Sequence, residues 1–220
     1  WAYETLVAKF DFPVLKTELQ LDRERERLAS EIVPYYRHDE NIGYMAHTAL
    51  NKVEFGAHEN LRPHLAAMLS EIYSRGVLGD HESQGDSSVV LENIYVSRDG
   101  AAVKIPVDEV YTLDAAKREL RSVVADICGN AVADEVYASS GLDALVSVDL
   151  TLDKKTTDEI YKSSLEDISP TQGLFKAHQT IVSYGDVVTA ETQQLLDSYR
   201  KEYDASIGYN GHPAFLWIGN

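Results

Sequence analysis

Histidine and glutamate side chains gather between residues 54 and 64, in the segment EFGAHENLRPH. Imidazole and carboxylate groups together are usual ligands of zinc and of non-haem iron. We therefore consider a metal site built from His58, Glu59 and His64. The two histidines are six positions apart, and this spacing does not place both on one face of a helix. The segment also fits a loop that enters a helix, in which Glu59 favours the positive end of the helix dipole.

Two further histidines could extend such a metal site. His38 opens the segment His-Asp-Glu, and this His-x-Glu spacing resembles the start of the ligand triad in iron enzymes that use 2-oxoglutarate. That class also needs a distal histidine followed by a basic residue, which neither His178 nor His212 provides. An exposed turn after Pro34 explains His38 more simply. His47 remains as the other additional candidate ligand.

A serine nucleophile would be a second kind of chemistry. The segment Gly-Asp-Ser at 85–87 resembles the start of Gly-Asp-Ser-Gly-Gly, which surrounds the nucleophile of the chymotrypsin family, and His47 would be its base. Ser88 and Val89 replace the glycines that let the backbone close around the oxyanion. The 40 positions between His47 and Ser87 also leave no room for that family's fold. Turn chemistry of Gly and Asp before a strand explains the same residues, so we predict no catalysis here.

Charge and hydropathy argue against nucleic acid and anionic membranes as partners of the chain. The formal net charge is −16, which repels phosphate backbones and anionic lipid. The densest basic run, Arg23 to Arg27, alternates with glutamates and fits a solvated helix face. No run of 18 or more apolar residues occurs. The sequence therefore predicts neither nucleic-acid binding nor a membrane span, and no G-x-G-x-x-G or Walker-type phosphate loop is present.

Cysteine usage bears on location. Cys128 is the single cysteine of the chain, which excludes an intramolecular disulfide and a thiolate-rich metal site. We expect a reducing intracellular compartment or a virion, although a secreted protein without disulfides would have the same composition.

Hydrophobic periodicity predicts strands that alternate with helices. We expect helices near residues 23–33, 60–75, 112–128, 156–168 and 189–206, and strands near 14–22, 44–55, 89–96, 101–107, 144–153, 179–188 and 214–218. The Asp-Gly pair at 99–100 indicates a hairpin. This pattern favours an α+β fold with a mixed or largely antiparallel sheet and four to five amphipathic helices packed on it. We expect a single domain over 1–220, with the loop 76–88 as the candidate subdivision.

Tyrosine is unusually frequent, with 13 tyrosines against 5 phenylalanines. Its ring is apolar and its hydroxyl is polar, which suits partly wet contact surfaces, although the margin of an ordinary core would also use it. Aromatic residues near both chain ends are expected to dock on this domain or on a neighbour. The predicted interface residues are Trp1, Tyr3, Tyr35, Tyr36, Tyr199, Tyr203, Tyr209 and Trp217.

The residues able to do chemistry are scattered, whereas the aromatic residues suit contact. We therefore expect a non-enzymatic structural or assembly subunit of a larger complex, for example a virion or tail component or an accessory subunit of an organelle complex. It would act through protein partners or self-association and need no cofactor. The alternative is a zinc or non-haem iron enzyme that uses His58, Glu59 and His64. A small-ligand-binding module is a third hypothesis.

Overall fold

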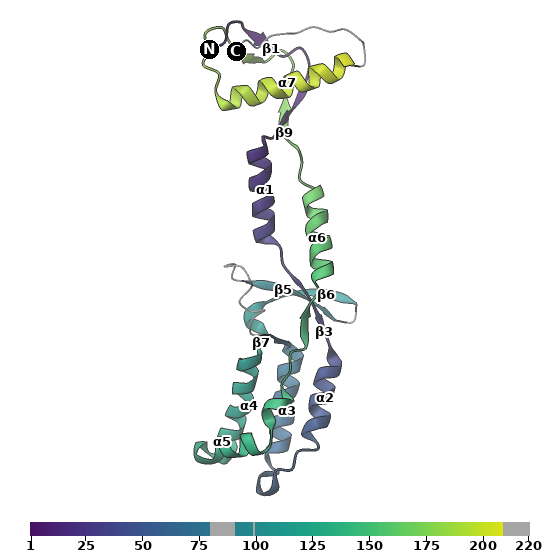
Figure 1. The fold of residues 1–220 in the computed structure, drawn as a ribbon, viewed down its shortest axis with the longest axis vertical. Helices are drawn as coiled ribbons and strands as arrows, with labels where there is room; N and C mark the ends of the chain where they lie inside the picture. Colours follow the sequence, from purple (N-terminus) through teal and green to yellow (C-terminus); the bar gives the residue numbers. More distant parts are fainter. Residues whose placement is uncertain (80–90, 99, 209–220) are drawn as a thin grey trace. The chain divides into compact units, whose positions relative to one another are not determined.

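A computed structural model describes residues 1–79, 91–98 and 100–208, and it divides the chain into two compact units (Figure 1). Unit 1 combines residues 1–29 with residues 163–220, and unit 2 consists of residues 30–162. Unit 2 is thus an insertion in the sequence of unit 1. The divisions fall inside helices α1 (Glu18–Glu31) and α6 (Lys154–Glu166), whereas the sequence suggested the loop 76–88.

The predicted α+β class is confirmed, with sheets of mixed or antiparallel strands. The described residues contain seven α-helices, more than the four to five expected. Within those residues, no helix combines the length and apolar character that crossing a membrane requires.

A four-stranded mixed sheet forms the first part of unit 2. Its strand order is β6 (Ala101–Pro106), β5 (Asn93–Arg98), β3 (Tyr35–His38) and β8 (Leu150–Leu152). Strands β3 and β5 run parallel, and the other pairs are antiparallel. The predicted hairpin is confirmed, because Arg98 pairs with Ala101. The short strands β4 (Val77–Leu78) and β7 (Tyr111–Thr112) form a separate parallel pair.

Four helices form the second part of unit 2. They are α2 (Glu40–Leu50), α3 (Leu61–Arg75), α4 (Leu113–Cys128) and α5 (Asn130–Ser139). Helix α3 contacts both α2 and α4, and Figure 1 shows the three side by side. Short 3-10 turns cover Gly56–His58, Val107–Glu109 and Leu142–Leu145. The helices enclose their own core, which includes fully buried Leu65, Leu69 and Leu120, so they pack mainly on one another.

Local signals explain where α4 begins and ends. The Thr112 side chain accepts a hydrogen bond from the Ala115 amide at 3.2 Å, as expected of an N-cap. Gly129 ends the helix with a φ of 82°, a conformation that favours glycine. The helix predicted near residues 112–128 is confirmed. The next helix, α5, was not predicted.

Two predicted strands are wrong. Residues 44–55 mostly form α2, which begins where the Asp39 carboxylate accepts from the Asn41 amide. Its buried residues Ala46 and Leu50 are four apart, which is helical spacing. Residues 14–22 divide between strand β2 (Phe12–Leu15) and the start of α1.

A capping box explains the early start of α1. The Thr17 hydroxyl accepts from the Gln20 amide at 3.2 Å, and the Gln20 side-chain carbonyl accepts from the Thr17 amide at 2.8 Å. This reciprocal pair satisfies two amides at the first turn of a helix. The T-x-x-Q signature therefore overrides the short alternation of apolar residues that suggested a strand.

Unit 1 is a small α+β unit built from distant segments. Strand β1 (Leu6–Val7) pairs with β10 (Thr180–Val182), and β2 pairs with β9 (Thr171–Phe175), both antiparallel. Helix α7 (Ala190–Gly208) packs against β2. The rings of Phe12 and Tyr199 meet edge to face at 5.2 Å in the core. The strand predicted at 214–218 lies outside the described residues.

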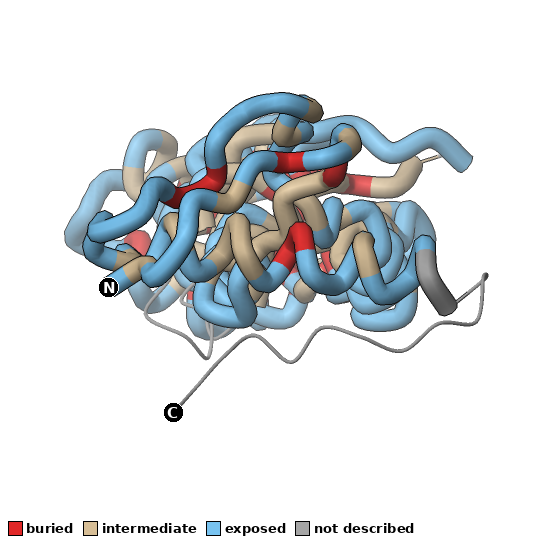
Figure 2. Tube along the Cα trace, turned by 90° about the horizontal axis from the view of Figure 1, so that it is seen from above, coloured by how far each residue is buried: buried red, intermediate tan, exposed pale blue. Residues whose placement is uncertain are grey.

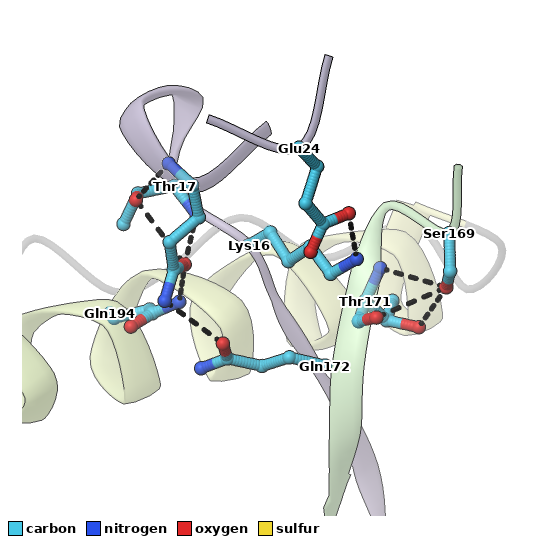
Figure 3. A network of polar contacts seen from close by, with 8 residues as sticks. Lys16, Thr17, Glu24, Ser169, Thr171, Gln172 and Gln194 are labelled. Atoms are coloured by element: carbon cyan, nitrogen blue, oxygen red, sulfur yellow. Dashed lines mark hydrogen bonds and ion pairs between the residues drawn. The ribbon is translucent and has the colours of Figure 1, made fainter. Parts of the chain in front are cut away.

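Polar contacts join the start of α1 to the rest of unit 1 (Figure 3). Gln20 accepts from the Gln194 side chain of α7 at 2.8 Å and donates to Gln172 of β9 at 3.0 Å. The Ser198 hydroxyl, which is buried, accepts from the Leu15 amide at 2.9 Å and donates to the Gln194 carbonyl. These bonds fix the first turn of α1 and the preceding strand to β9 and α7.

Candidate functional site

A buried histidine–aspartate pair is the most chemically distinctive feature of unit 2. His38 at the end of β3 lies 3.0 Å from Asp149, measured from Nε2 to Oδ2, and the Asp149 side chain is fully buried. The other carboxylate oxygen of Asp149 accepts from the Val77 amide at 2.6 Å. Main-chain bonds from the Asp39 amide to the Asp149 carbonyl and from the Asp149 amide to the Val77 carbonyl reinforce the arrangement. Asp149 therefore connects β3, β4 and the start of β8.

The electrostatics of this pair follow from its burial. Burial raises the pKa of Asp149, because a carboxylate loses hydration there, and the Val77 amide and the His38 ring act in the opposite direction. Among the described residues, Nδ1 of His38 and Nε of Arg98 are buried side-chain atoms without a hydrogen-bond partner. An aspartate that orients a histidine is known from hydrolases, but such a site also needs an accessible nucleophile. Here the carboxylate holds three strands together.

The structure does not bring together the predicted metal ligands. Nδ1 of His58 lies 3.5 Å from the sulfur of Cys128. Glu59 forms an ion pair with Arg62 at 2.8 Å, and His64 contacts the main-chain carbonyl of its own helix at 3.0 Å. Within the described ranges, no group of three or more His, Cys, Asp or Glu side chains is arranged to hold a metal ion.

The serine hydrolase hypothesis also finds no assembled site. Ser87 lies outside the described residues. His47, its suggested base, contacts Ser70 instead, with Oγ and Nε2 3.2 Å apart. The Ser70 hydroxyl also bonds the Ala66 carbonyl at 3.0 Å, which is the usual i−4 bond of a serine within a helix.

A groove lies between α3 and α4, with a volume of about 360 Å³. Met68, Val123 and Ile127 supply apolar surface, and Glu71 and Asp126 add carboxylates. The remaining lining residues are His64 and Ala67. The lining is therefore mainly apolar, with two carboxylates and one imidazole.

The predicted interface tyrosines have different environments. Tyr36 and Tyr199 are buried in the cores of unit 2 and unit 1 respectively. Tyr35 is partly buried and stacks on Tyr95, with ring centroids 4.6 Å apart. Tyr203 is partly buried beside Tyr199. Because these four rings pack within their own units, the remaining interface candidates are the predicted residues near the chain ends.

Two predicted interface residues are highly exposed. Trp1 is 79% exposed and Tyr3 is 86% exposed. Tyr209 and Trp217 lie outside the described residues. The sequence analysis missed a third exposed aromatic residue in unit 1, Tyr184, which is 75% exposed. Its position beside Gly185, which lies inside the strand predicted at 179–188 and has a φ of 84°, was the available signal.

Comparison with protein families gives one match. Residues 46–201 match the family 7TMR-HDED, described as "7TM-HD extracellular". The matched region covers more than two thirds of the chain and includes parts of both unit 2 and unit 1. Comparisons with curated proteins and with solved structures give no match. The chain belongs to the 7TMR-HDED family.

Proposed function

We propose that this chain is an extracellular domain of a membrane protein and that it acts by binding, without catalysis of its own. The family match carries this proposal, because its description contains the terms 7TM and extracellular. The match continues from unit 2 into unit 1, so both units are part of the domain that the family defines.

The chemistry of the described residues supports a binding role. The His38–Asp149 pair is buried and serves to connect strands. The residues suggested for a metal enzyme, His58, Glu59 and His64, contact three different protein groups. By contrast, the α3–α4 groove offers apolar and acidic groups to an external partner. The protein contacts expected from the sequence are therefore retained in the proposal, while the family match gives no support to a virion or organelle component.

The topology of the chain suggests which unit connects to a membrane-spanning part. The segment before α1 and helix α7 both belong to unit 1, while unit 2 is inserted between them. Both main-chain connections of unit 2 therefore lead into unit 1. We assign attachment to unit 1 and partner binding to the α3–α4 groove of unit 2.

The single cysteine is consistent with an extracellular location. The expectation of a reducing compartment rested on the absence of disulfides. A small extracellular domain needs disulfides mainly where its hydrophobic core is insufficient. Here the core of the α2–α5 helices includes many fully buried side chains, among them Leu61, Leu65 and Leu120, so the fold does not depend on a covalent link.

Labelling in intact cells tests the proposed location. In the longer membrane protein, Lys155→Cys in a Cys128→Ser background places a thiol where the native side chain is 84% exposed. We expect a membrane-impermeant maleimide to label this thiol without permeabilisation. The Cys128→Ser protein without the new cysteine measures background labelling. Labelling that requires permeabilised cells would contradict the extracellular assignment.

A further inference from the structure

An exposed aromatic patch lies at one edge of unit 1. We define it as Trp1, Tyr3, Tyr184 and Val187, all of which are exposed. The N-terminal segment lies beside β1 in Figure 1 and is drawn as exposed in Figure 2. Large aromatic side chains rarely gather on a surface without a binding role, since burying them in an apolar environment is favourable.

Hydrogen bonds hold the two parts of the patch together. The Ala2 amide donates to the Asp186 carbonyl at 2.8 Å, and the Gly185 amide donates to the Ala2 carbonyl at 2.9 Å. The Tyr184 amide also donates to the hydroxyl of Thr5 at 3.0 Å. The main chain beside each ring is therefore fixed to the opposite segment, and the patch is part of the folded unit.

We propose that this patch contacts the surface of the lipid bilayer, an inference that rests on the proposed function. Trp and Tyr are the side chains that prefer the boundary between lipid and water, because their rings are apolar and carry one polar group. The patch has this composition, with Trp1, Tyr3 and Tyr184. It also lies on unit 1, the unit through which the chain would be joined to a membrane-spanning part.

The charge around the patch indicates which lipid headgroups it could contact. Glu4 and Asp186 are exposed acidic residues within the same two segments, and the whole chain carries a formal charge of −16. Electrostatic attraction to anionic headgroups therefore cannot drive binding of the patch to the bilayer. The patch fits zwitterionic headgroups, with the aromatic rings at the headgroup level.

Vesicle binding tests the contact. In a Trp217→Phe background, Trp1 is the single tryptophan of the 220-residue chain. We expect phosphatidylcholine vesicles to shift its fluorescence to shorter wavelength and to retain the protein on flotation. Replacing Tyr3 and Tyr184 with Ser should weaken partitioning by roughly tenfold, because two large apolar ring surfaces are lost. Adding anionic lipid should weaken it further.

A matched variant distinguishes vesicle binding by the patch from nonspecific binding by any exposed apolar side chain. Tyr44 and Met45 of α2 are also exposed, with Tyr44 at 74%, and the double variant Tyr44→Ser, Met45→Ser should bind vesicles like the parent chain. Equal weakening in both double variants would overturn the proposal, as would vesicle binding that the patch variant leaves unchanged. Self-association that depends on the patch, without vesicle binding, would assign it to a protein contact and overturn it too. None of these results affects the labelling of Lys155→Cys, which tests location alone.

Discussion

Replacing Asp149 by Ala should lower the free energy of unfolding by about 2–6 kcal/mol, because it leaves two buried polar groups without a partner and each costs about 1–3 kcal/mol. The substitution leaves the Val77 amide without its 2.6 Å acceptor and His38 without its 3.0 Å partner. Both groups are buried at a point where three strands meet. Urea unfolding of the 220-residue chain, followed by circular dichroism, measures the change.

An exposed aspartate supplies the control for this substitution. Asp134 of α5 is exposed and makes a long 3.6 Å contact with Arg121, so Asp134→Ala should change the same free energy by less than about 0.5 kcal/mol. If Asp149→Ala lowered the free energy of unfolding no more than Asp134→Ala, the contacts of Asp149 with His38 and Val77 would not stabilise the strands.

The second large effect is expected at Gly76, which ends α3 and precedes β4. Its φ is 97°, a value that side chains disfavour, and an added Cβ would lie 2.7 Å from Cδ1 and 2.9 Å from Cγ of the fully buried Leu150. Gly76→Ala therefore combines backbone strain of about 1–3 kcal/mol with overpacking of about 1–3 kcal/mol. Thermal and urea unfolding should both show the loss.

Gly129 separates the two contributions to the Gly76 effect. It ends α4 with nearly the same geometry, φ 82° and ψ 147° against φ 97° and ψ 155° at Gly76. An added Cβ at Gly129 would meet nothing within 4 Å. Gly129→Ala should therefore show the strain alone and lose less stability than Gly76→Ala. Equal losses would mean that Leu150 moves aside without cost.

Sequence patterns predicted the fold best where periodicity and end signals agreed. Helix α4, predicted near residues 112–128, is confirmed, and in the structure Thr112 caps its start and Gly129 ends it. The prediction failed at α1, where a short alternation suggested a strand while the Thr17–Gln20 capping box specified a helix. Local hydrogen bonding at a helix start thus outweighed a pattern only four residues long.

The chemistry of the chain was harder to predict because burial depends on distant segments. The sequence predicted a strand near residues 144–153 but did not single out Asp149, whose side chain is fully buried beside His38. The partners are separated by 111 positions, and no local pattern connects them. The same limit applies to the aromatic patch, because the segments that carry Tyr3 and Tyr184 are joined only through the folding of unit 1.

Thiol reactivity in the membrane-embedded protein tests most directly the proposal that the chain is an extracellular domain and that unit 1 contacts the membrane. In a Cys128→Ser background, Tyr184→Cys and Tyr44→Cys place thiols at two positions of nearly equal exposure, 75% and 74%. An impermeant maleimide should label Tyr184→Cys several-fold more slowly in intact cells than after detergent extraction, and Tyr44→Cys at similar rates in both. Equal rates for Tyr184→Cys before and after extraction would contradict the membrane contact, and no labelling of either thiol in intact cells would contradict the extracellular assignment.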